Sequence, residues 1–262
     1  ERFFGQGSGN QILLVDEAHN LFDRAHDMYS ATLGTRAFQT LLDILPESDR
    51  FHRDPIQAIL NYLNDLSRSM NSPTTSGEDN SSPGDLSGAK SGPSWPELEN
   101  NKAMRLVQDR NFLATTAPPK VLSGLLLNWL RESRDLFDLI EDPKARRRLV
   151  EIIGQAKFFT RIIEDLWSGS YVACVRQGPT GLAIRLICLD ISDKISKTYM
   201  NKHASVFFSA TLEPISYFAG NFCGKSRDNR PDTLSLPSPF PPENLAAYIC
   251  PFIETTYRER CR

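Results

Sequence analysis

A run of four apolar residues followed at once by two acids constrains the fold of this chain most. Ile12 to Val15 read ILLV, a Gly/Ser/Asn-rich stretch precedes them, and residues 16–19 read DEAH. A run that is apolar on both faces is typical of a strand buried in a parallel sheet. The sequence therefore predicts a buried strand that ends at a pair of carboxylates.

The acids at this strand end suit nucleotide chemistry. In open α/β sheets, ligands bind beyond the carboxyl ends of the strands. There Asp16 is predicted to hold Mg²⁺, and Glu17 to orient and deprotonate the water that attacks a γ-phosphate. The alternative is a structural role, in which the charges only stabilise the N-terminus of the helix that follows.

A second polar motif follows another apolar run. Ser209-Ala210-Thr211 comes directly after VFF, in the predicted strand Ser205–Thr211. Hydroxyl groups at this strand end can bond to the acids of a neighbouring strand, although a turn or a helix cap is the alternative. The 189 residues 20–208 separate His19 from Ser209, which is far more than one strand–helix unit needs.

The intervening pattern is mostly helical. The apolar spacing predicts helices over 20–33, 36–45, 55–70, 121–140, 144–167 and 191–200, and a helix over PISYFAGNF. Period-two alternation in YVACV and LAIRLICL predicts a β-hairpin, and LAAYICPFI is predicted to form a strand. The order of these elements predicts an α/β domain that is interrupted by a helical one.

Composition adds constraints on partners and location. The net charge is −2 and the pI is about 6.1, so bulk positive charge does not indicate nucleic acid, and any such contact must come from local patches. The basic residues Lys144, Arg146–Arg148, Lys194, Lys197 and Lys202 could contact phosphate, but a solvated helix face is favoured. We found no segment typical of a membrane span or a signal peptide, so we expect an intracellular, cytoplasmic location.

Three further stretches carry little chemistry. The Ser/Gly/Pro-rich run 71–96 is predicted to be a disordered surface loop. Gly5–Gly9 (GQGSG) is predicted to be a turn, because it precedes a strand and lacks the lysine of a phosphate loop. The five cysteines are widely spaced with no C-x-x-C, which favours buried reduced thiols over a disulfide framework or a zinc site.

Together, ILLVDEAHNL, VFFSATLEPISYF and LPSPFPPENL resemble the XPD/DinG-like DNA helicases of superfamily 2. The resemblance covers residues 1–33 and 188–262. It implies a RecA-like P-loop NTPase motor domain interrupted by a helical arch insertion, with ATP and Mg²⁺ as cofactors and single-stranded or forked DNA as the partner. It also implies that Asp16 binds Mg²⁺–ATP, that Glu17 is the catalytic base, that His19 couples the nucleotide site to the motor, and that Ser209 and Thr211 link hydrolysis to strand movement.

The resemblance also implies a division of the chain into four parts. Residues 1–33 and 187–225 would be parts of the first motor domain, residues 34–186 the arch with the loop 71–96, and residues 226–262 the connector and the start of the second motor domain.

The sequence departs from the family at one required feature. No G-x-x-x-x-G-K-S/T phosphate loop occurs in it. The cysteines that ligate an iron–sulfur cluster in many members should precede the DEAH box, so we assign no cluster to this chain, although a longer polypeptide could carry one. We expect a central fragment of an ATP-dependent DNA helicase, in DNA repair or replication, that shows no ATPase activity alone. The alternative is a non-catalytic module that binds single-stranded DNA or a protein and keeps vestigial motor motifs.

Overall fold

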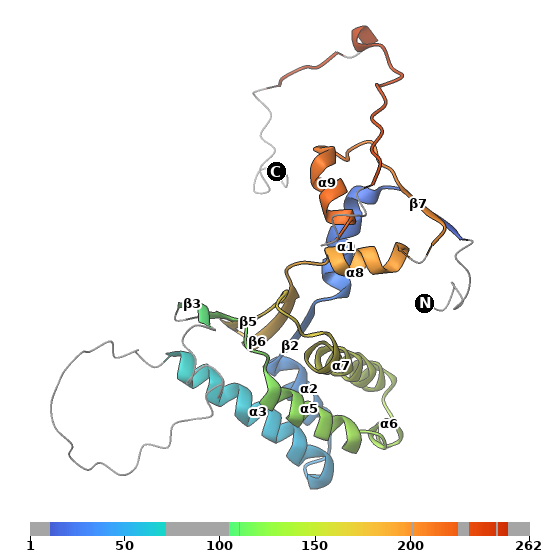
Figure 1. The fold of residues 1–262 in the computed structure, drawn as a ribbon. Coiled ribbons are helices and arrows are strands. Elements are labelled where there is room, and N and C mark those ends of the chain that lie inside the picture. Colours follow the sequence, from blue (N-terminus) through green and yellow to red (C-terminus); the bar gives the residue numbers. More distant parts are fainter. Residues whose placement is uncertain are drawn as a thin grey trace, which may run out of the picture.

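The computed structural model describes residues 11–71, 105–109, 111–200, 202–224, 231–244 and 246–250. The GQGSG turn at 5–9 and nearly all of the loop 71–96 lie outside these residues. The described chain forms a small lobe, built from its two ends, and a larger module between them (Figure 1). The architecture is mixed α/β, with one parallel and one antiparallel sheet.

The small lobe contains the predicted DEAH strand. β1 (Ile12–Val15) pairs in parallel with β7 (Ala204–Phe207), as the sequence predicted for a parallel sheet. Three short helices pack beside this pair, and stacked aromatic rings join them: Phe222 lies 4.3 Å from Phe207 and 5.0 Å from Phe22, between ring centroids. The helices are α1 (Leu21–Met28), α8 (Ser192–Tyr199) and α9 (Ile215–Phe222).

The prediction that the DEAH strand is buried on both faces was wrong for the described residues. Ile12 and Leu14 are 63% and 66% exposed. The reason is that the described part of this sheet has two strands only, and the helices cover one of its faces. Val15, on the face opposite to that of Ile12 and Leu14, packs against the core.

The larger module is built on a five-stranded antiparallel sheet in the order β2-β6-β5-β4-β3. β2 and β6 are neighbours, with Ala31 opposite Leu186, so the chain enters and leaves the module at adjacent strands. The strands are β2 (Ala31–Gly34), β3 (Arg105–Asp109), β4 (Phe112–Thr115), β5 (Tyr171–Gly178) and β6 (Gly181–Cys188). The hairpin predicted from YVACV and LAIRLICL is confirmed as β5 and β6.

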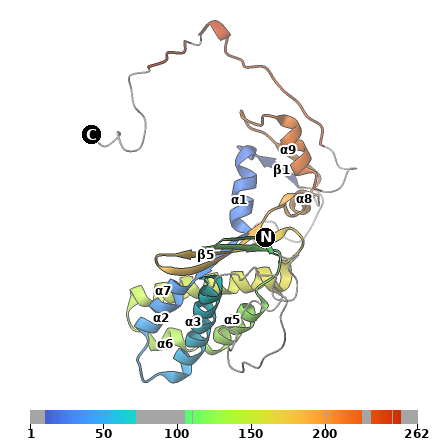
Figure 2. The same cartoon turned by 90° about the vertical axis from the view of Figure 1, so that its left-hand side faces the viewer.

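Helices cover one face of this sheet, and the small lobe lies on the other side of it (Figures 1 and 2). Their buried faces carry the apolar residues expected from helical spacing, with Phe38, Leu126, Trp129 and Phe159 at 0–1% exposure. The helices are α2 (Thr35–Ile44), α3 (Arg50–Asn71), α5 (Lys120–Glu132), α6 (Leu136–Leu139) and α7 (Pro143–Arg161), and a π-helical turn (Ile162–Leu166) follows α7.

The helix predicted over 121–140 divides into α5 and α6, and the one predicted over 144–167 ends at Arg161. Two helix starts differ from the prediction for local reasons. α3 begins at Arg50 and not at Pro55. At this start, the carboxylate of Asp49 accepts a hydrogen bond from the backbone N–H of His52 and also contacts the imidazole ring of His52. α7 begins at Pro143 because Asp142 caps it, accepting from the N–H groups of Lys144 and Ala145 at 3.3 and 3.0 Å.

Three strand predictions need correction. The helix expected over 20–33 ends at Met28, because Ala31–Gly34 pairs with β6 instead. β3 and β4 were not predicted. The strand expected in LAAYICPFI is not formed over 246–250, and its last residues lie outside the described part of the chain.

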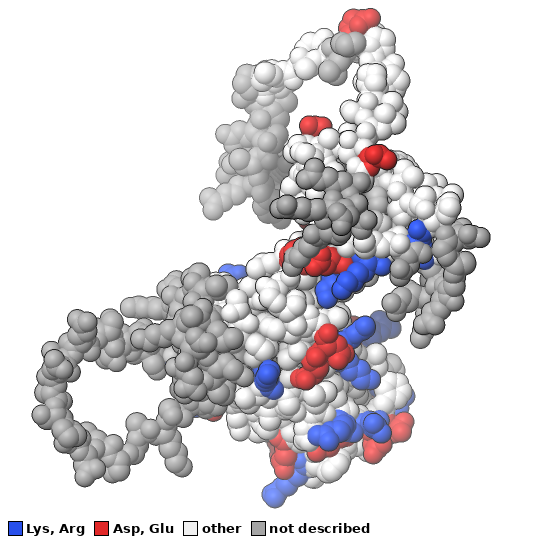
Figure 3. Space-filling model, viewed as in Figure 1, with Lys and Arg blue, Asp and Glu red and all other residues white. Residues whose placement is uncertain are grey.

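The surface is of mixed charge. On the face shown in Figure 3, acidic and basic side chains alternate over the helical part of the module. Among the described residues, we found no helix that is both long and apolar enough to cross a membrane. Cys188 and Cys223 are buried thiols outside any disulfide, as expected, and desolvation raises the pKa of the Cys188 thiol. Cys250 is a thiol too, but an exposed one.

Candidate nucleotide site at the ends of β1 and β7

The two predicted motifs lie side by side because their strands are paired in register. Val15 is opposite Phe207. The backbone pairing continues past both strands: the N–H of Phe208 donates to Val15 O at 3.0 Å, and the N–H of Ala18 donates to Phe208 O at 3.1 Å. Residues 16–19 and 208–211 therefore meet at one edge of the sheet, although they are far apart in the chain.

A left-handed residue turns the chain at the end of β1. Glu17 has φ 50° and ψ 41°, an uncommon conformation for a residue with a side chain. The carboxylate of Asp16 accepts from the N–H of Glu17 at 2.7 Å and so supports this turn. Ala18 is fully buried and begins the single 3-10 turn that carries His19. Asp16 and Glu17 consequently belong to different local environments, as the prediction of two separate roles requires.

His19 connects the two motifs. Its Nδ1 lies 2.8 Å from Ser209 Oγ, 3.1 Å from Thr211 Oγ1 and 3.1 Å from Glu17 Oε2. Ser209 Oγ also donates to Glu17 Oε2 at 3.3 Å. A ring nitrogen has either one proton or one lone pair, so these three contacts compete with one another. The arrangement therefore offers alternative bonding patterns between the same four side chains.

The structure thus brings four of the five predicted site residues into one hydrogen-bonded group: Glu17, His19, Ser209 and Thr211. Asp16 lies beside this group. Its carboxylate accepts from the backbone N–H of Glu17, and it does not bond to the side chains of His19, Ser209 and Thr211.

A small cavity adjoins the acids. It has a volume of about 120 Å³ and is lined by Val15, Asp16, Glu17, Asn20, Leu21 and Arg24. Asn20 and Arg24 were not predicted from the sequence as site residues. Asn20 is the N-cap residue of α1, directly after the DEAH motif, and Arg24 follows four residues later on that helix. This spacing is the signal that would have placed them beside the carboxylates.

The carboxylate of Asp16 has the chemistry of a magnesium ligand. Among the described residues, no group of three or more His, Cys, Asp or Glu side chains could hold a metal ion. Mg²⁺ in nucleotide sites is commonly held by one or two carboxylates, with water and substrate phosphates supplying the other ligands. A single aspartate at the rim of a cavity fits that pattern, whereas it would not fit a metal held by protein ligands alone.

One sequence resembles a phosphate loop and is not one. Residues 219–226 read AGNFCGKS, which differs from G-x-x-x-x-G-K-S/T at its first position. Ala219 to Phe222 are the last turn of α9, so a helix precedes the glycine, whereas a phosphate loop leads from a strand into a helix. Gly224 instead ends α9 with φ +65° and packs against Ser196 of α8.

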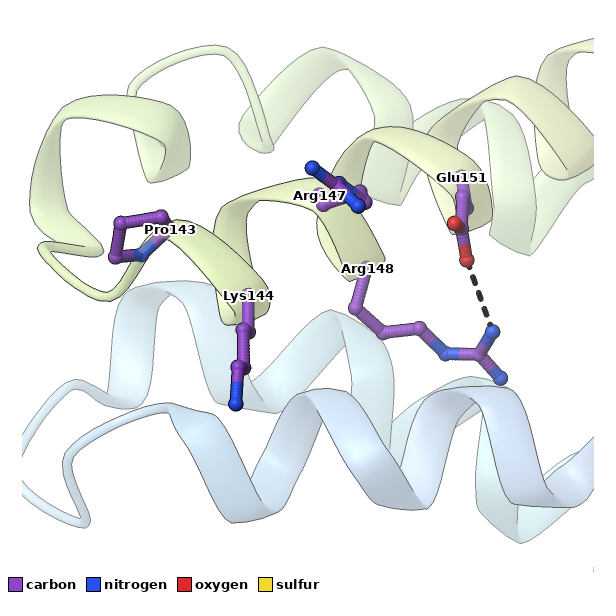
Figure 4. A pocket seen from close by; sticks show the side chains of 5 residues that line it. All are labelled: Pro143, Lys144, Arg147, Arg148 and Glu151. Carbon is purple, nitrogen blue, oxygen red and sulfur yellow. Dashed lines mark hydrogen bonds and ion pairs between the residues drawn. The ribbon is translucent and has the colours of Figure 1, made fainter.

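The predicted basic residues do not form one patch. Lys144, Arg147 and Arg148 of α7 line an open cavity of about 300 Å³ together with Pro143 and Glu151, and Arg148 pairs with Glu151 at 3.0 Å (Figure 4). The small lobe holds Lys194 and Lys202, where Lys194 lies over the ring of Tyr29 and Lys202 donates to Gln11 Oε1 at 2.6 Å. Much of the predicted basic set therefore has local partners.

Comparison with known proteins relates the chain to helicases at a distance. No family model matches it. It is 21% identical over 246 residues to the ATP-dependent DNA helicase chl1 of Aspergillus niger (strain ATCC MYA-4892 / CBS 513.88 / FGSC A1513). The alignment covers 90% of this chain and 26% of that protein, so the chain spans about a quarter of its relative's length. The chain is similar to a DNA helicase along most of its length.

Proposed function

We propose that this chain is part of an ATP-dependent DNA helicase and carries the water-activating and coupling residues of a RecA-like motor domain, interrupted by an arch insertion. The observation that carries the proposal is the contact of His19 with both Glu17 and Ser209. It joins two polar motifs at the ends of neighbouring parallel strands, which is where α/β sheets bind ligands.

In this proposal Asp16 and Glu17 have different roles. Asp16 holds a hydrated Mg²⁺, which neutralises charge on the nucleotide phosphates. Glu17 accepts a proton from the attacking water. His19, Ser209 and Thr211 exchange hydrogen bonds when the Glu17 carboxylate changes partner, which links hydrolysis to the position of β7.

The insertion between the two motifs fits the same proposal. The module from Ala31 to Cys188 closes on itself through the β2–β6 pair, so it leaves the strand ends of the small lobe free to meet. The proposed partner is DNA, single-stranded or forked. The proposed location is intracellular, in association with that DNA. A role in DNA repair or replication is an expectation of the family resemblance.

The test replaces Glu17 by Gln in a polypeptide that contains this chain and a phosphate loop. ATP turnover should fall by roughly 10²–10⁴, the scale for losing a general base, while nucleotide affinity is kept because the side chain keeps its shape. Glu47→Gln is the matched control, since Glu47 is exposed and distant in the fold from both strand ends. Unchanged turnover in the Glu17 variant would refute its role.

The second candidate is a non-catalytic binding module with vestigial motor motifs. The observation that favours it is that the chain contains no phosphate loop, so we expect no ATPase activity from the 262 residues alone. The two candidates separate in the longer polypeptide: ATP hydrolysis that depends on Glu17 supports the motor, and nucleic-acid binding without any hydrolysis supports the module.

A further inference from the structure

The start of α1 forms one wall of the small cavity beside the acids. The cavity has a volume of about 120 Å³, and its lining includes Asp16, Glu17, Asn20 and Arg24. Asn20 and Arg24 are four residues apart along the helix, so they lie on one side of it with about 5–6 Å between their Cβ atoms. Helical side chains lean toward the N-terminus of their helix, so the side chain of Arg24 leans back toward Asn20 and the strand end. An amide and a guanidinium therefore line the same cavity as the two carboxylates.

The side chain of Asn20 is not used by the helix that it precedes. An asparagine at the N-cap position usually accepts a bond from a backbone N–H two or three residues later. In this chain the backbone of Asn20 is helical, with φ −81° and ψ −9°, and its side chain makes no capping bond. It also forms no hydrogen bond with any other residue that the structure describes. The amide is half-buried at the cavity and is therefore available as a donor to a ligand.

The guanidinium of Arg24 is available in the same way. Within the described part of the chain it forms no hydrogen bond and no ion pair, although Asp16 and Glu17 line the same cavity. Arg53 of the larger module shows the contrast, because its guanidinium donates to two backbone carbonyls near the end of α2, each at 2.7 Å. Arg24 is thus a cation that the described structure places beside the acids without using it for the fold.

The charges of the lining decide what kind of ligand fits. Two carboxylates and one guanidinium give the cavity a net charge of −1. In the proposed function Asp16 holds Mg²⁺, which brings this net charge to +1 and makes the cavity attractive to a phosphate. The guanidinium adds a planar fork of N–H donors that matches two oxygens of one phosphate. A volume of about four water molecules suits a phosphoryl group and not a nucleoside.

We propose that Arg24, with the amide of Asn20 beside it, binds the terminal phosphate of ATP. The water that Glu17 activates attacks this phosphate, so the phosphate must lie within reach of Glu17, next to the cavity that Glu17 shares with Arg24. Arg24 consequently distinguishes a nucleoside triphosphate from a diphosphate. This inference rests on the proposed function, because it requires ATP at the ends of β1 and β7, and it adds the residue that recognises the γ-phosphate.

The test compares two nucleotides on a polypeptide that contains this chain and a phosphate loop. Isothermal titration calorimetry with Mg²⁺ measures the binding of ADP and of the β,γ-imido analogue of ATP, which is not hydrolysed. Loss of a hydrogen bond to a charged group weakens binding about tenfold to a hundredfold, so Arg24→Gln should lower the affinity for the analogue by that factor. The affinity for ADP should stay as in the parent, because ADP has no γ-phosphate. Asn20→Ala should lower the affinity for the analogue about fivefold and leave that for ADP unchanged.

Lys197→Gln is the matched control. It removes the same charge from an exposed position of α8 in the same lobe, and Lys197 does not line the cavity. Both affinities should stay as in the parent. Arg24→Lys keeps the charge without the planar fork and should recover part of the affinity for the analogue. Urea unfolding of Arg24→Gln without nucleotide should match the parent, because an exposed side chain without a partner contributes little to stability.

The possible results separate this inference from the proposed function. If Arg24→Gln weakens ADP and the analogue equally, or weakens neither, the inference is overturned, while ATP turnover that depends on Glu17 still supports the motor. An Arg24→Lys variant as weak as Arg24→Gln would also overturn it, since the positive charge would then not be what the phosphate contacts. If the parent polypeptide binds neither nucleotide, the proposed function fails and this inference fails with it.

Discussion

Replacing Gly224 by Ala tests directly whether this glycine belongs to a ligand site or to the packing of α9 on α8. Gly224 has φ +65°, in the region that favours glycine. A Cβ atom added there would lie 2.7 Å from Ser196 Oγ and 3.0 Å from Asp193 Oδ1. Both distances are shorter than normal contacts, so the substitution forces α8 and the end of α9 apart or strains the backbone.

The expected loss can be worked out from these two effects. The left-handed conformation costs a residue with a Cβ about 1–2 kcal/mol. Overpacking by one methyl group costs about 1–3 kcal/mol. Gly224→Ala should therefore destabilise the small lobe by about 2–5 kcal/mol. Gly220→Ala in the same helix is the control: it is exposed and has no atom within 4 Å of the added Cβ, so it should stabilise by about 0.5–1 kcal/mol.

The assay is hydrogen exchange of the amides in α8 and α9, supported by urea unfolding. The two substitutions should shift the opening free energy of these helices in opposite directions, while the amides of the larger module stay unchanged. If Gly224→Ala leaves α8 and α9 as protected as in the parent, and nucleotide binding by the longer polypeptide falls instead, the packing argument is refuted and AGNFCGKS must contact the ligand.

Two more substitutions test the two parts of the fold. Phe222→Ala removes a 4%-exposed ring that stacks on Phe22 and Phe207; we expect a loss of about 3–5 kcal/mol confined to the small lobe in urea unfolding, and an equal loss in both parts would contradict this. Tyr171→Phe removes a bond from the Tyr171 hydroxyl to Tyr29 O, at 3.1 Å, and should cost about 1–2 kcal/mol at neutral pH. Burial raises the pKa of Tyr171 above its ordinary value near 10, so the folded state holds the phenol proton more tightly than the unfolded state. The free energy of unfolding should therefore fall as the pH rises above about 10. The Tyr171→Phe variant should lose that part of the pH dependence.

The sequence predicted the features that local patterns encode. The four residues Ile12–Val15 are a strand, α8 and α9 lie where their apolar spacing placed them, and YVACV and LAIRLICL form the β5–β6 hairpin. The bond from the Ser209 hydroxyl to the Glu17 carboxylate followed from one further assumption, that the strands ending in these two motifs are neighbours. The contact of His19 with Ser209 was not predicted. Those predictions succeeded because each depends on periodicity or on a single pairing.

The missed pairings of β2 with β6 and of β4 with β5 have a different physical cause. Ala31–Gly34 continues the helical spacing of α1, yet it forms β2 because its partner β6 lies about 150 residues later in the chain. β4 forms a local hairpin with β3, and its other partner, β5, lies about 60 residues later in the chain. Pairing of this kind is decided by the side chains of both strands and by the core they share, so no window of a dozen residues contains the information.

The same closure explains how an insertion of this size is compatible with one site. If the ends of the module were far apart, folding it would pull β1 and β7 out of register. Because β2 and β6 are hydrogen-bonded neighbours, the two ends of the module lie side by side. The chain therefore returns to the small lobe close to the point where it leaves it. The register of β1 with β7 is then set by the lobe alone, through the pairing that runs from Ile12 and Ala204 to Val15 and Phe207. That register is what holds His19 Nδ1 2.8 Å from Ser209 Oγ across 190 positions of sequence.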